Sequence, residues 1–208
     1  MMKTNDERLK NILQYLSSIS HVDSGEIPGI DLYMDQVTTF MDEHLKDTRR
    51  YPDDKVLTKT MINNYAKNNL LPPPVKKKYS KDHMLLLIFI YYFKNLLSFA
   101  DIEEIFRPLT QAHFSNPNSA VNLETVYNEV FALADDQMEH LKDDVKQKFE
   151  KASQTFANAA VSDEEREYLQ LFAFICELSF DVYLKKQMIE AISDQLRAEN
   201  PPTDRKRK

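Results

Sequence analysis

Two neighbouring groups of polar side chains have the types and spacing needed to hold a polyanion. The first group shares one side of a predicted helix and consists of Lys59, Thr60, Asn63, Asn64 and Lys67. Asparagine amides pair with adenine edges in the major groove of duplex DNA, while lysine and threonine contact phosphates. The second group is Lys76, Lys77 and Lys78, which follows three prolines that stiffen the chain. Together they predict an interface with double-stranded DNA, in which the lysines hold phosphates at little entropic cost.

Two tyrosines, Tyr65 and Tyr79, belong to the same stretch. Either ring could stack on a sugar of the nucleic-acid backbone, and Tyr79 is therefore included among the predicted contacts. The alternative is that both rings pack in the core with their hydroxyl groups at the surface, which is the more common arrangement for tyrosine. The polar groups have a plain alternative as well, since a lysine run can be a solvated turn and two asparagines a solvated helix face.

The charge distribution favours the interface. The chain carries a net charge of −6, but the stretch from Arg49 to Lys81 holds nine Lys and Arg residues against two Asp, a local charge of +7. The rest of the chain therefore carries −13. Such asymmetry allows one surface to attract a polyanion while the protein as a whole stays acidic.

Several classes of function are excluded or disfavoured by composition. Two glycines are too few for the glycine-rich loops that hold nucleotide phosphates. The five histidines form no recognisable metal spacing with a cysteine or with each other, and no set of nucleophile and base can be argued. The acidic residues between 135 and 144 are typical of a solvated helix side. We expect no enzymatic activity, no metal and no cofactor.

The only cysteine, Cys176, cannot form an internal disulfide, and its apolar neighbours predict a buried, inert thiol. The first residues lack the apolar core of a secretion signal. These features favour a cytoplasmic protein.

A nearly continuous apolar block, residues 84–97, must be covered on almost every side yet is too short to span a membrane. It predicts a central buried helix over 81–97, which Ser80 begins. Thr4 with Glu7 predicts the start of a first helix, Asp31 that of a second, Thr58 that of a short helix over 59–68, and Ser98 that of the helix after the buried one.

Two long helices are predicted beyond the polar segment 110–122. Apolar residues recur every 3.6 positions over 123–159, and Ser162 with Glu165 begins a second helix that runs to about 196. The predicted fold is all-α: a winged-helix-like domain over 1–110, a long helical hairpin over 111–198 and a disordered tail over 199–208. Because one hairpin cannot cover the wide apolar surface of its second helix, we expect the hairpin to form a homodimer.

The stretch around the polar groups resembles known families. A threonine cap, a tyrosine, Leu70–Leu71, prolines, a basic segment and a Tyr-Ser helix start are similar to the winged helix-turn-helix of MerR-type regulators. Thr60 and Asn63 stand where that pattern has arginines, and Asn69 where it has a helix-ending glycine. More closely, LTKTMINNY (57–65) and KKYSKDH (77–83) resemble the bacterial domain of unknown function 1836 over about 31–110. That resemblance implies a fold but no activity.

These observations predict a DNA-binding transcriptional regulator of MerR-like type. The alternative is a protein–protein interaction module, in which a degenerate winged helix and the acidic hairpin present the working surface.

Overall fold

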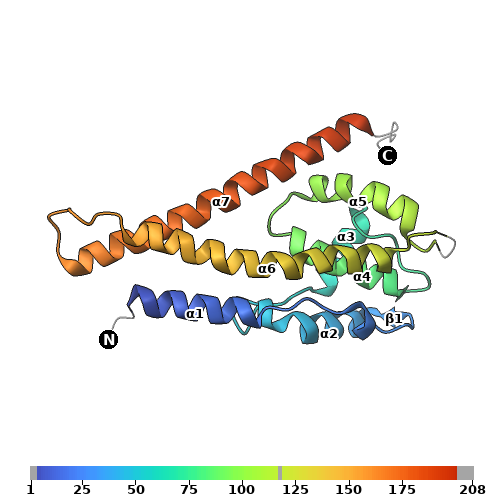
Figure 1. Cartoon of the computed structure of the whole chain (residues 1–208). Helices are drawn as coiled ribbons and strands as arrows, with labels where there is room; N and C mark the ends of the chain where they lie inside the picture. Colours follow the sequence, from blue (N-terminus) through green and yellow to red (C-terminus); the bar gives the residue numbers. More distant parts are fainter. Residues whose placement is uncertain (1–3, 117–118, 201–208) are drawn as a thin grey trace. The chain divides into compact units, whose positions relative to one another are not determined.

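The computed structural model describes residues 4–116 and 119–200, and most of the tail predicted to be disordered, 199–208, lies outside them. Helices dominate, so the all-α prediction is confirmed. The described elements, drawn in Figure 1, are α1 (Asn5–Ser18), η1 (Ser24–Glu26), β1 (Leu32–Tyr33), α2 (Met34–Leu45), η2 (Lys46–Thr48), α3 (Lys59–Lys67), β2 (Lys78–Tyr79), α4 (Lys81–Phe93), α5 (Phe99–His113), α6 (Leu123–Ser153) and α7 (Asp163–Glu199). Within the described ranges, no helix has the length and apolarity that crossing a membrane requires.

The chain forms two compact units. The larger unit comprises His21–Phe131 and Met188–Lys208, and the smaller one Met1–Ser20 and Ala132–Gln187. This division differs from the expected boundary at residue 110. The first turns of α6 belong to the larger unit because the buried hydroxyl group of Tyr127 donates to the carbonyl oxygen of Val22 (2.6 Å). The Tyr127 ring also lies 5.4 Å from that of Phe89 on α4.

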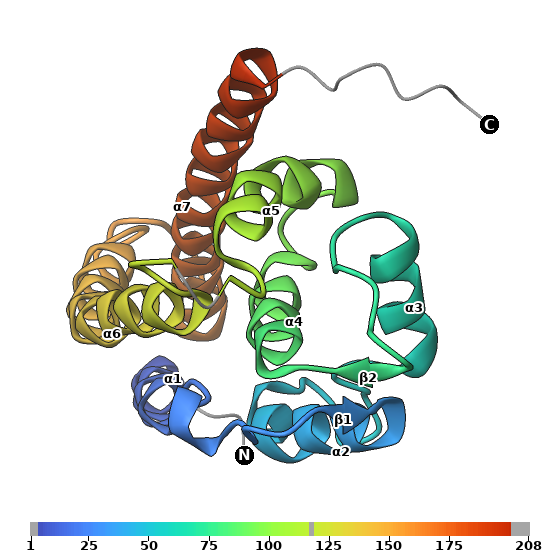
Figure 2. The same ribbon diagram turned by 90° about the vertical axis from the view of Figure 1, so that its right-hand side faces the viewer.

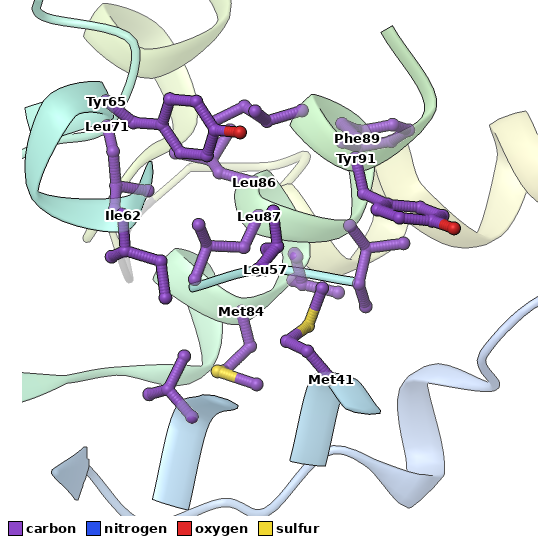
Figure 3. Close-up of a cluster of buried hydrophobic side chains, with 14 of the residues drawn as sticks. Met41, Leu57, Ile62, Tyr65, Leu71, Met84, Leu86, Leu87, Phe89 and Tyr91 are labelled. Carbon is purple, nitrogen blue, oxygen red and sulfur yellow. The ribbon is translucent and has the colours of Figure 1, made fainter. Parts of the chain in front are cut away.

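The core of the larger unit is built around α4. Every side chain from His83 to Tyr91 is buried, which confirms the central buried helix. Figure 3 shows side chains of α2, α3 and α4 meeting in this core, among them Met41, Ile62 and Leu87. The helix ends at Phe93, four residues earlier than predicted. Lys94 is half-buried just beyond it, where its ammonium group donates to the carbonyl oxygen of Val56 (2.7 Å).

The smaller unit consists of α1 and the parts of α6 and α7 that lie within its bounds. Its core is Val145, Ala152 and Phe174, covered by the apolar stripe of α1, which is made of Leu9, Ile12, Leu13 and Leu16. The predicted capping box is present, since the Thr4 hydroxyl group accepts from the Glu7 amide (3.3 Å) and the Glu7 carboxylate from the Thr4 amide (2.9 Å).

Candidate nucleic-acid interface

The short helix α3 presents a polar row to solvent. Its start is fixed by Thr58, whose hydroxyl oxygen accepts from the Met61 amide (3.2 Å), as predicted. Ile62 and Tyr65 are buried, at 0% and 2% exposure, and hold the helix against the core. The five predicted residues of the row, Lys59, Thr60, Asn63, Asn64 and Lys67, are all exposed. The row therefore lies on the side of α3 that faces away from the core.

The end of α3 turns the chain toward the basic segment. Asn69 has a φ of 58°, the left-handed conformation at which many helices end. The amide of Asn69 donates to the carbonyl oxygen of Ala66 (3.4 Å) and that of Leu70 to the carbonyl oxygen of Tyr65 (2.9 Å), so these two carbonyl groups of the last turn are satisfied. Asparagine adopts this conformation more readily than most residues, which explains why it can end the helix here.

The basic segment forms a tight hairpin. The amides and carbonyl groups of Val75 and Lys78 are mutually hydrogen-bonded (3.1 and 2.9 Å), and Lys76 and Lys77 between them have φ values of 50° and 64°. Two successive left-handed residues in a two-residue loop are the signature of a type I′ turn. We call Val75–Lys78 the basic hairpin. Its two tip residues, Lys76 and Lys77, are exposed.

A pair of two-residue strands holds the base of the hairpin. β1 pairs with β2 in antiparallel register, Leu32 opposite Tyr79 and Tyr33 opposite Lys78 (Figure 2). The sequence predicts a helix that begins at Asp31 and gives no sign of β1, because a strand of two residues has no periodic pattern. The helix begins at Met34 instead.

The lysines of the site differ in their electrostatic surroundings. Among the described residues, Lys67, Lys76 and Lys77 make no ion pair. Lys59 is paired with Asp35, and both side chains are exposed. The Lys78 ammonium group lies 5.2 Å from the centre of the Tyr33 ring in a cation–π contact. Within the described part of the chain, three of the five predicted lysines can thus meet an anion without breaking an ion pair.

Tyr79 does not lie at the surface, and its inclusion among the DNA contacts is corrected here. Its side chain is 3% exposed, and its ring meets that of His83 edge to face at 5.4 Å. Burial raises the pKa of the Tyr79 hydroxyl group. The ring is a core residue that anchors β2, as the alternative interpretation held for both Tyr65 and Tyr79.

His83 links the hairpin to α4, a role that the sequence pattern did not predict. Its ring is 3% exposed, and its Nδ1 accepts from the Ser80 amide (3.0 Å) and lies 2.8 Å from the Ser80 hydroxyl oxygen. The rings of Tyr79 and Phe114 contact it edge to face. Burial lowers the pKa of His83, which favours the neutral ring. The Ser-x-x-His spacing at 80–83 is the signal from which this cap could have been predicted.

The described residues contain no cluster of three or more His, Cys, Asp or Glu side chains that could hold a metal ion. The predicted site residues on α3 and the basic hairpin carry amide, hydroxyl and ammonium groups, which bind by hydrogen bonds and charge.

Comparison with known proteins gives one match. Residues 22–131 match the model of a family described as a domain of unknown function, DUF1836. No curated protein and no solved structure matches the chain. The matched range agrees within one residue with the first segment of the larger unit and includes α3 and the basic hairpin. The chain belongs to the DUF1836 family.

Proposed function

We propose that the larger unit binds double-stranded DNA and that the protein regulates transcription as a winged helix-turn-helix protein similar to MerR-type regulators. The observation that carries the proposal is the combination of an exposed lysine, threonine and asparagine row on α3 with a rigid hairpin that carries two exposed lysines without an ion pair.

The dimensions of α3 suit a major groove. A helix with its side chains is about 10–12 Å across, which a groove about 12 Å wide admits, and the nine residues of α3 make it about 14 Å long. Asn63 and Asn64 are exposed in the middle of the helix, where amide groups can reach base edges. Lys67, one turn further, would contact a phosphate.

The basic hairpin suits the phosphate backbone. Its turn is fixed by hydrogen bonds between Val75 and Lys78 and by the pairing of β1 with β2. Because the turn is already fixed, little backbone conformational entropy is lost when Lys76 and Lys77 contact phosphates. The order of strand, two helices, strand and helix from β1 to α4 supports the winged-helix assignment.

The alternative, a partner-binding surface on the acidic side of α6, receives less support. Glu139 pairs with Lys142 (2.7 Å), Asp143 with Lys146 (3.0 Å), and Asp144 with Lys148. These lysines offset much of the negative charge that such a surface would use.

The test is selection of bound sequences from a random duplex library by the full chain, followed by affinity measurements against salt. Three to four lysine–phosphate contacts per chain predict a slope of about −3 to −4 in log affinity against log salt. The control removes two exposed lysines elsewhere, in a Lys10→Ala, Lys151→Ala variant, which should keep the parent's slope. No enriched sequence and no salt-dependent binding would overturn the proposal.

A further inference from the structure

The smaller unit exposes an unusual amount of apolar surface on one helix. Seven large apolar side chains of α7 between residues 168 and 184 are 50–66% exposed. We call six of them the α7 apolar face: Tyr168, Phe172, Ile175, Phe180, Tyr183 and Leu184. The buried side of the same segment, represented by Phe174 and Leu178, packs in the core of the unit. The helix is thus apolar on two sides, of which the unit itself covers one.

The size of this face matches what a stable dimer needs. Four aromatic side chains, each about 60% exposed, offer roughly 500 Å² of apolar surface. A standard interface buries about 800 Å² per partner, of which about 60% is apolar, or roughly 480 Å². The largest apolar patch on a monomeric protein is usually about 300–600 Å², so with Ile175 and Leu184 added the face lies at or above that limit.

We propose that the α7 apolar face binds the same face of a second copy, with the two α7 helices antiparallel around a two-fold axis near Cys176. Tyr168, Phe172, Cys176, Phe180 and Leu184 are each four residues apart and form one ridge on the helix. An antiparallel pairing centred at Cys176 places Tyr168 opposite Leu184 of the second copy and Phe172 opposite its Phe180. Cys176 itself is half-buried, not fully buried as the sequence predicted.

The charges at the two ends of the face favour this direction. Helix α7 carries the exposed carboxylates of Glu164 and Glu165 before the N-terminal end of the face and the exposed Lys185 just beyond its C-terminal end, where the Lys185 ammonium group also pairs with Asp181 of the same helix (2.9 Å). Antiparallel helices bring the glutamates within about one turn of the lysine of the other copy. Parallel helices would instead place like charges together, which costs free energy. This proposal does not depend on whether the larger unit binds DNA.

The first experiment measures the mass of the full chain by sedimentation across a dilution series. The parent is expected to be a dimer, and Phe172→Glu or Leu184→Glu should raise the dissociation constant at least about 100-fold, because each change places two carboxylates in the interface. Leu133→Glu is the matched control, since Leu133 is 72% exposed on α6, outside the face. A parent that is monomeric throughout, or a dimer that Phe172→Glu and Leu184→Glu leave intact, would overturn the proposal.

Cross-linking tests the geometry and needs no disruptive variant. A short bis-maleimide should join two parent chains through Cys176, and Cys176→Ser should abolish the product. In the Cys176→Ser background, a mixture of Tyr168→Cys and Leu184→Cys chains should give a mixed dimer, whereas Tyr168→Cys alone should not. In an antiparallel dimer of two Tyr168→Cys chains, the two introduced thiols would lie 16 residues, or about 24 Å, apart along the helix axis. Efficient cross-linking of Tyr168→Cys to itself would refute the antiparallel arrangement.

Discussion

Replacing Lys76 by Asn and Lys77 by Gly separates the charge of the basic hairpin from its shape. Both residues are left-handed, with φ values of 50° and 64°, a conformation that costs most residues about 1–2 kcal/mol but glycine little and asparagine less than most. Asn-Gly is also the pair that type I′ turns prefer. The free energy of unfolding of the double variant should therefore equal that of the parent or exceed it by up to about 1 kcal/mol, which means that the variant is at least as stable.

The same variant should lose DNA affinity. Two lysine–phosphate contacts contribute about 1.8 to the salt slope, which at physiological ionic strength corresponds to roughly 30-fold in affinity. The assay is fluorescence anisotropy with a selected duplex over a salt series, combined with thermal unfolding of both proteins. Lys10→Ala, Lys151→Ala serves as the charge-matched control.

Two results would refute this reasoning. An unchanged salt slope and affinity would show that the hairpin tip does not touch phosphates. A large loss of stability would show that the left-handed turn does not set the shape of the hairpin, and the binding result would then carry no weight.

Three further predictions concern single side chains. Asn63→Ala should relax base preference at one or two positions of the selected site and leave the salt slope unchanged, and a repeated selection that returns the same site would contradict this. The parent should lose stability as the pH falls below about 6.5, because unfolded His83 takes up a proton that the buried ring, with its lowered pKa, does not. His83→Asn should reduce that dependence by at most about 1.4 kcal/mol per pH unit in urea unfolding, and identical profiles would assign the dependence elsewhere. Arg197→Ala removes a cation that lies 3.1 Å from Asp101 and 3.9 Å from the buried Glu104, and it should lower the free energy of unfolding by about 1–2 kcal/mol in urea titration. A variant as stable as the parent would contradict this prediction.

The helices could be predicted because their signals are local. Thr58, Ser80 and Ser98 each stand immediately before a helix of the structure. The left-handed end of α3 at Asn69 follows from the same kind of reasoning, since asparagine tolerates that conformation. The exposed row of α3 was predictable as well, because helical spacing separates it from the buried Ile62 and Tyr65.

The parts that were missed depend on residues far apart in the chain. β1 exists because Lys78 and Tyr79 lie opposite Tyr33 and Leu32, more than forty positions earlier. The turn at Lys76–Lys77 lacks the Asn-Gly pair that marks a type I′ turn in sequence. The burial of Tyr79 could not be predicted because it depends on the pairing of this residue with the distant Leu32.

The most direct test of the central claim is a titration of the full chain with a selected duplex, followed by NMR of the asparagine side-chain amides and the lysine ammonium groups. Binding predicts that the signals of Asn63, Asn64, Lys76 and Lys77 shift together at one affinity, while that of Lys151 stays unchanged. Duplex binding that leaves both the α3 row and the hairpin tip unperturbed would contradict the account.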